Sequence, residues 1–154
     1  MEIERKFLVK KIPPVLDDYK KRYIEQAYLC TSPTVRVRRD NDDYYLTYKG
    51  SGMMAREEYN LPLTKESYEH LLSKADGIII TKTRYEIPDG DSLIIELDIF
   101  EGEYKGLMLA EVEFATEEDA VSYTPPDWFG EDVSERAEFC NSYLSAHCCR
   151  DIPL

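Results

Sequence analysis

The chain has 154 residues, which suffices for one domain with a hydrophobic core and is too short for two. It carries 19 Lys and Arg residues against 31 Asp and Glu residues, and this net charge of −12 argues against nucleic acid and anionic membranes as partners. No apolar run has the length of a membrane span and the first residues are charged, so we expect a cytoplasmic, single-domain protein over residues 1–154.

Alternating apolar and polar residues, broken by turn residues, predict strands along most of the chain. The predicted strands cover residues 2–9, 23–30, 34–40, 43–50, 54–63, 78–87, 92–100 and 107–115. Helices are predicted at residues 15–22, 64–77, 116–123 and 134–147. Thr64 and Gly77 are expected to cap and to stop the second helix, and the last helix is expected to close one end of the structure. This order indicates one β-rich α+β domain of eight, mainly antiparallel strands.

The four cysteines form no CxxC pair and have no ligand spacing with the two histidines. The vicinal pair Cys148 and Cys149, beside His147, is compatible with a redox or metal role. It is equally compatible with two unpaired thiols in a reducing compartment.

Charged residues recur at alternate positions of the predicted strands, so within each strand they share one face. In VRVR, for example, Arg36 and Arg38 lie opposite Val35 and Val37. Most strands carry one sign of charge, and like charges on one face require opposite charges nearby. The residues on this face are seven acids and six bases: Glu2, Glu4, Glu58, Glu96, Asp98, Glu111 and Glu113, with Lys6, Arg36, Arg38, Lys49, Lys82 and Arg84.

Two structures explain this pattern, and the simpler is a half-buried sheet whose polar face meets water. The other is an eight-stranded antiparallel closed β-barrel, a tunnel with a charged lumen and with helices packed outside. Charges inside such a tunnel need water, one another and a charged ligand. Acidic clusters favour a divalent cation and basic clusters favour phosphate, so a metal-bound polyphosphate satisfies both.

The segment EIERKF resembles the ExExK signature of the CYTH superfamily, also called triphosphate tunnel metalloenzymes. The resemblance continues in order through IEQAYL, VRVR, YKG, REE, KTRY, ELDIF, GLMLAEVEF, FGEDVS and CNSYL, over nearly the whole chain. It implies an eight-stranded antiparallel tunnel that hydrolyses triphosphate compounds with Mg²⁺ or Mn²⁺. One position departs from the pattern, because many relatives carry a glutamate where this chain has Asn60, which cannot supply a carboxylate.

The resemblance also implies a role for each charged residue of the shared face. Glu2, Glu4, Glu111 and Glu113 would hold the metal with Asp98 nearby, and the same four glutamates with Lys6 would be catalytic. Glu58 and Glu96 would line the lumen in support. The phosphates would be bound by Lys6, Arg36, Arg38, Lys49, Lys82 and Arg84.

The compact N-terminus is most similar to small bacterial members that act on inorganic triphosphate. This similarity favours the hydrolysis of tripolyphosphate to pyrophosphate and phosphate. The alternatives are hydrolysis of thiamine triphosphate or a nucleoside triphosphate, adenylate cyclase activity, and a module that binds metal and polyphosphate without catalysis. An organic substrate would need an aromatic pocket for its base or ring.

Overall fold

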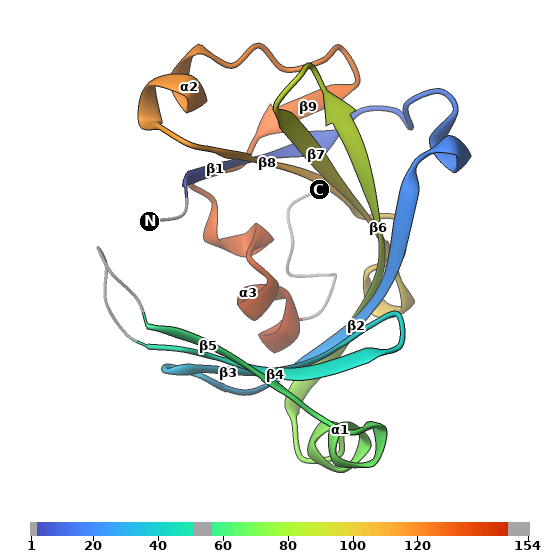
Figure 1. Cartoon of the computed structure of the whole chain (residues 1–154), viewed down its shortest axis with the longest axis vertical. Helices are drawn as coiled ribbons and strands as arrows, with labels where there is room; N and C mark the ends of the chain where they lie inside the picture. Colours follow the sequence, from blue (N-terminus) through green and yellow to red (C-terminus); the bar gives the residue numbers. More distant parts are fainter. Residues whose placement is uncertain (1–2, 51–56, 148–154) are drawn as a thin grey trace.

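The computed structural model describes residues 3–50 and 57–147, which form one continuous antiparallel sheet with short helices (Figure 1). The strands are β1 (Ile3–Val9), β2 (Lys20–Thr31), β3 (Thr34–Asp40), β4 (Asp43–Lys49), β5 (Glu58–Pro62), β6 (Asp76–Asp89), β7 (Leu93–Glu101), β8 (Met108–Phe114) and β9 (Phe129–Asp132). The α-helices are α1 (Lys65–Leu72), α2 (Glu117–Ser122) and α3 (Asn141–Ala146). Three 3₁₀ turns complete the list: η1 (Leu16–Asp18), η2 (Gly102–Tyr104) and η3 (Ala137–Phe139). No helix of these two ranges is long and apolar enough to cross a membrane.

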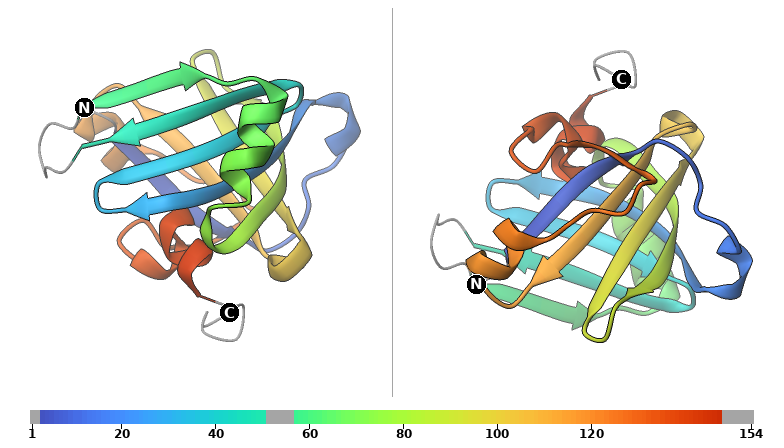
Figure 2. Two further views of the ribbon diagram at one scale, coloured as in Figure 1. Left: turned by 90° about the horizontal axis from the view of Figure 1, so that it is seen from below. Right: turned by 90° about the horizontal axis from the view of Figure 1, so that it is seen from above.

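The sheet is strongly curled, and its strand order is β5-β4-β3-β2-β6-β7-β8-β1-β9 (Figures 1 and 2). This confirms the antiparallel α+β tunnel architecture, with two differences in detail. A ninth strand, β9, pairs with β1, and within the described residues the edge strands β5 and β9 do not pair with each other. The wall is therefore curled rather than closed.

The helix predicted at residues 15–22 is wrong for most of its length, because only residues 16–18 form a 3₁₀ turn and β2 already begins at Lys20. Residues 20–22 pair with β6 instead, where Lys20 lies opposite Glu86 and Arg22 opposite Arg84. An ion pair of 3.5 Å between Lys20 Nζ and Glu86 Oε2 accompanies this pairing. The sheet ladder thus overrides the helical pattern of a polar segment.

The helix α3 lies inside the curl, not outside as the closed-barrel prediction required, and closes one end as expected (Figure 1). The inner face of the sheet is apolar at this end, so that the helix can bury Leu144 against Phe139, Ile80 and Leu109. The helix approaches the backbone of β6 very closely, because a Cβ at Gly77 would lie 2.2 Å from the carbonyl oxygen of Ser145. Gly77 also has a φ of +75°, so any other residue there would be doubly unfavourable.

A second core lies on the outer face of β1, β6, β7 and β8, beneath α2 and the segment before β9. Phe7, Leu97, Val112, Trp128 and Phe129 are buried there. Because the strands alternate, each apolar residue on this outer face fixes a neighbouring residue on the inner face. Burial outside the curl therefore directs the charged residues into it.

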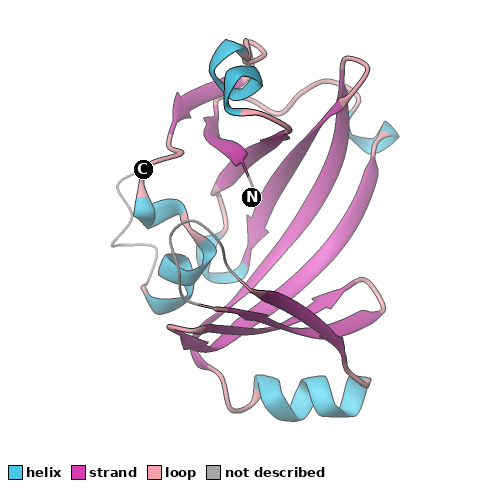
Figure 3. Cartoon of the chain, turned by 60° about the vertical axis from the view of Figure 1, so that its left-hand side comes forward, coloured by secondary structure: helices cyan, strands magenta, loops and turns pink. Residues whose placement is uncertain are grey.

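The helix α1 covers the outer face of β2, β3 and β4 (Figures 2 and 3). It buries Tyr68, whose hydroxyl donates a hydrogen bond of 2.9 Å to Glu25 Oε1. At its first turn Thr64 and Ser67 form a reciprocal capping box, as the sequence predicted for the cap at Thr64.

Replacing Thr64 by Ala should lower the free energy of unfolding by about 1 kcal/mol, because the Ser67 amide would lose its acceptor. Urea unfolding of the two proteins measures the difference. The exposed neighbour Lys65, replaced by Ala, is the matched control, and we expect a change within about 0.5 kcal/mol. Equal midpoints for Thr64→Ala and the parent would contradict a stabilising cap.

Candidate functional site

The strand register brings the alternating charges onto the inner face of the curl. Residues directly opposite one another in an antiparallel pair share a face. Between β1 and β8, Glu4 lies opposite Glu113 and Lys6 opposite Glu111, and Glu111 in turn lies opposite Glu96 of β7. In the middle of the sheet Arg84 of β6 lies opposite Asp98 of β7. On the other side of the curl the inner-face pairs are Thr34 with Lys49 and Lys49 with Glu58.

A cavity of about 740 Å³ lies between these two groups of strands. Most of the predicted site residues line it: Glu4, Lys6, Arg36, Arg38, Lys49, Glu58, Arg84, Glu96, Glu111 and Glu113. Lys82 and Asp98 are not among the lining residues, and Glu2 lies outside the described residues. The cavity is thus acidic along β1 and β8 and basic along β3 and β4.

Asp98 and its two basic neighbours form a buried cluster behind the cavity. Arg84 donates from Nε to Asp98 Oδ1 at 2.7 Å and from Nη2 to Oδ2 at 2.9 Å, and Lys82 Nζ lies 2.8 Å from the same Oδ2. Burial would raise the pKa of Asp98, but Lys82 and Arg84 outweigh it and hold that pKa well below its usual range. Both carboxylate oxygens of Asp98 are therefore already engaged by cations of the chain itself, whereas the family pattern implies a role for Asp98 next to the metal.

Burial raises the pKa of a carboxyl group but lowers the pKa of an ammonium group, and Lys82 of this cluster shows the second effect. The side chain of Lys82 is fully buried, which lowers the pKa of its ammonium to about 8 despite the attraction of Asp98. Lys82 Nζ also lies 3.4 Å from Asn141 Oδ1 of α3. Lys82 thus connects the sheet to α3 rather than facing the cavity directly.

Lys6 lies between the acidic strands and the C-terminal segment. Its Nζ is 3.4 Å from Glu111 Oε1 and donates to the carbonyl oxygen of Phe139 at 3.1 Å. Burial lowers the pKa of this ammonium, but attraction to Glu111, Cys140 and Glu4 is stronger in sum and the pKa rises. Lys6 is therefore a permanent cation at the acidic side of the cavity.

The acidic side has the chemistry of a divalent-cation site. Glu4 and Glu113 are directly opposed, and like charges in that position repel unless a cation lies between them. Burial, followed by repulsion from Glu111 and Asp98, raises the pKa of Glu96 against the opposing effect of Arg84. Within residues 3–50 and 57–147, no three acidic, histidine or cysteine side chains already converge closely enough to hold a metal ion.

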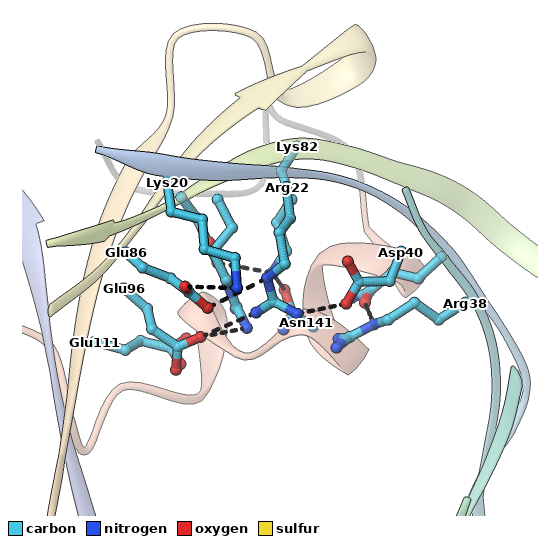
Figure 4. Close-up of polar contacts among 12 residues, drawn as sticks. Lys20, Arg22, Arg38, Asp40, Lys82, Glu86, Glu96, Glu111 and Asn141 are labelled. Atoms are coloured by element: carbon cyan, nitrogen blue, oxygen red, sulfur yellow. Dashed lines mark hydrogen bonds and ion pairs between the residues drawn. The ribbon is translucent and has the colours of Figure 1, made fainter. Parts of the chain in front are cut away.

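Arg22 of β2 is a charged inner-face residue that the sequence reasoning missed. Figure 4 shows it between Asp40 and the carboxylates of Glu86 and Glu96, at 2.5, 3.5 and 3.6 Å. It was missed because the helix predicted over residues 15–22 removed it from the sheet. The continued alternation from Tyr28 back to Arg22 is the signal that could have identified it.

Several uncharged residues of the site were not predicted, because the alternating pattern in the sequence consists of charged residues. Gln26 and Thr47 are fully buried next to the arginines of β3. Cys140, Asn141 and Ser142 line the cavity from the C-terminal segment, which was expected to close one end of the structure but not to contribute to the site.

The strongly curled sheet thus encloses an inner cavity that is acidic on one side and basic on the other, which is the architecture of a tunnel protein. A model of the CYTH domain matches residues 1–138, and the chain belongs to this family. The family assignment made from the sequence motifs is thereby confirmed.

Relatives with a named activity extend over nearly the whole chain. A protein of Nitrosomonas europaea named inorganic triphosphatase is 39% identical over 150 residues, which cover 94% of this chain and 96% of the relative. One of Acetivibrio thermocellus with the same name is 36% identical over 154 residues, covering 93% and 92%. A crystal structure of an inorganic triphosphatase, 34% identical, superposes with a TM-score of 0.79 and covers 100% of this chain and 97% of that one.

Proposed function

We propose that the protein hydrolyses inorganic triphosphate to pyrophosphate and phosphate inside the cavity, as a metal-dependent hydrolase of phosphoanhydride bonds. The observation that carries this proposal is that carboxylates of β1 and β8 and basic residues of β3 and β4 line one cavity. The relatives named inorganic triphosphatases support the same reaction. The continuous sheet from β1 to β9 supports a single domain for the whole chain.

The basic side of the cavity is proposed to bind the phosphates. Arg36 and Arg38 suit the non-bridging oxygens, because a planar guanidinium can donate to two oxygens at once. Lys6 and Lys49 contribute point charges from either side. Asp98 is proposed to position Arg84 and Lys82, since its oxygens already accept from both side chains.

The acidic side is proposed to hold the metal. Glu4, Glu111 and Glu113, with Glu2, offer the carboxylate oxygens that Mg²⁺ and Mn²⁺ prefer. An ion held by these carboxylates would supply positive charge against the phosphates and a water of lowered pKa.

Hydrolysis itself requires positioning and charge stabilisation more than covalent chemistry by the protein. Water forms a new P–O bond at a terminal phosphorus while the bridging P–O bond breaks, and pyrophosphate leaves. We propose that a carboxylate of β8, Glu111 or Glu113, accepts the proton of that water. Glu58 and Glu96 line the cavity as supporting charges.

An organic triphosphate is the second candidate, and the lining disfavours it. Tyr28 is the one aromatic residue among the described residues that line the cavity, so a base or thiazole ring finds little surface to stack on. A module that binds without catalysis would not need carboxylates on β1 and β8.

Phosphate release from tripolyphosphate, ATP and thiamine triphosphate, each with Mg²⁺, Mn²⁺ or EDTA, tests the proposal. We expect turnover of tripolyphosphate with either metal and its loss in EDTA, because the opposed carboxylates need a cation. Faster turnover of ATP or thiamine triphosphate than of tripolyphosphate would show that the protein prefers an organic triphosphate. Tight binding without turnover would leave a binding module, and neither binding nor turnover would contradict the proposal.

A further inference from the structure

The arginines around the cavity differ in what holds them. Arg84 is bound by carboxylates, with Asp98 at 2.7 Å and Glu96 Oε2 at 2.9 Å from Nη1. For Arg36 and Arg38, the described part of the chain places no carboxylate within ion-pair distance of 4.0 Å. These two guanidinium groups are held by uncharged acceptors instead.

Gln26 holds Arg38. It lies opposite Arg38 in the β2–β3 register, is fully buried, and its Oε1 accepts a hydrogen bond of 2.7 Å from Arg38 Nε. An Nε–H can only donate, so the amide oxygen must face the guanidinium. Arg38 itself lines the cavity and is 9% exposed, with its two terminal nitrogens beyond the contact to Gln26 (Figure 4).

Asn60 holds Arg36 through one intermediate residue. Arg36 Nη2 donates to Thr47 Oγ1 at 3.3 Å, and Thr47 Oγ1 donates to Asn60 Oδ1 at 2.6 Å. Thr47 is fully buried, and the register places it opposite both Arg36 and Asn60. Asn60 is the residue that departs from the glutamate of the family pattern, so here a neutral amide stands where a carboxylate would be expected.

We infer that Gln26 and Asn60 are positioning residues that fix Arg38 and Arg36 without cancelling their charge, so that both guanidinium groups carry a full positive charge toward the substrate. This inference rests on the proposed binding of tripolyphosphate in the cavity. A carboxylate at either position would orient the arginine equally well but would compete with the phosphate for its charge.

This arrangement has a cost in stability. Burial and the neighbouring Arg36 lower the pKa of Arg38, and the neutral amide of Gln26 adds no opposite charge. The Nε2 of Gln26 is buried without a hydrogen-bond partner among the described residues. A glutamate at position 26 removes this unpaired N–H and adds an opposite charge, so it should not destabilise the ligand-free protein.

The near-isosteric variants Gln26→Glu and Asn60→Asp test the inference. We expect the dissociation constant for tripolyphosphate, measured by calorimetry in EDTA, to rise about tenfold or more for Gln26→Glu and less for Asn60→Asp, which acts through Thr47. In the metal-supported assay KM should rise more than kcat. The melting temperature of both ligand-free variants should equal or exceed that of the parent.

Asn41→Asp is the matched control, because it adds the same charge in the exposed β3–β4 turn, and it should leave the dissociation constant unchanged. Parent-like affinity in both cavity variants, or a lower melting temperature for both, would overturn the inference. If one variant cannot be purified folded, the other decides. A parent that neither binds nor hydrolyses tripolyphosphate would instead contradict the proposed function.

Discussion

Replacing Glu113 by Gln is expected to lower kcat for tripolyphosphate hydrolysis by a factor on the order of 10²–10³. Glu113 lies opposite Glu4 across the β1–β8 pair and lines the cavity. The amide keeps the size and shape of the side chain but removes one negative charge from the proposed metal site. Steady-state kinetics over a range of Mg²⁺ concentrations measures the effect, and the concentration needed for half-maximal rate should rise with it.

The control for this variant is Glu69→Gln, because Glu69 is exposed on α1, on the outer face of the sheet. This change removes the same charge far from the cavity, and parent-like kinetics are expected. A Glu113→Gln protein with the rate and Mg²⁺ dependence of the parent would show that Glu113 holds no ion needed for turnover.

The alternation of charged and apolar residues predicted much of the inner face, since a strand can bury only one of its two sides in the outer core. Arg36 and Arg38 are placed by Val35 and Val37, and the register of β1 with β8 follows from the same rule. The alternation places a residue on the inner face, but it does not determine whether that residue lines the cavity or is buried at the apolar end of the curl. Phe100 and Leu109 share the inner face with Asp98, and packing against the C-terminal segment makes this end of the curl dry.

The sequence did not predict the strand β9, the position of α3 or the role of Gln26, and each of these omissions has a physical reason. The strand β9 has four residues after a proline-rich segment, too few to show alternation, and its place is set by pairing with β1. The position of α3 depends on which face of the sheet its apolar residues pack against. The amphipathic pattern of the helix does not specify that face. Gln26 carries no charge, so a search for charged residues could not find it.

Replacing Asp98 by Asn is expected to lower the free energy of unfolding by about 3–5 kcal/mol, because it leaves two buried cations without their counter-ion. Lys82 is fully buried, and Arg84 is 9% exposed at its side chain. The amide group would also direct N–H donors at side chains that can only donate. Urea unfolding measures the loss, and kcat should fall too, since Arg84 lines the cavity and loses its bidentate contact.

Two further variants test whether the loss of stability in Asp98→Asn comes from the buried cluster or from the removal of a negative charge in general. Asp127→Asn breaks an ion pair of 3.7 Å with Lys11 that is largely exposed, so a change below about 0.5 kcal/mol is expected. Adding Lys82→Met to Asp98→Asn removes one of the two orphaned cations and should restore part of the stability. If the double variant were no more stable than Asp98→Asn, the ammonium of Lys82 would not be the source of the loss.

The pH dependence of the stability of Asp98→Asn tests whether Lys82 is the group responsible for the lost stability. Burial first, and then repulsion from Arg84 and Arg38, lowers the pKa of Lys82 from 10.5 to about 8, against the attraction of Asp98. Between these values the unfolded chain binds more protons, so this lysine makes stability rise with pH, and its penalty is fully present below about pH 8. Without Asp98 the pKa falls further and the penalty at neutral pH is larger.

The stability gap between the parent and Asp98→Asn should therefore be larger at neutral pH than above pH 8. The contribution of Lys82 to this gap shrinks as the pH rises to about 8, and above that pH Lys82 is neutral in both proteins. Only the contact of Asp98 with Arg84 then still separates them, because a guanidinium stays charged throughout this range. In a Lys82→Met background the same gap should be flat with pH, which unfolding curves at successive pH values will show. A gap that does not change with pH in the presence of Lys82 would mean that Asp98 stabilises the fold through Arg84 alone.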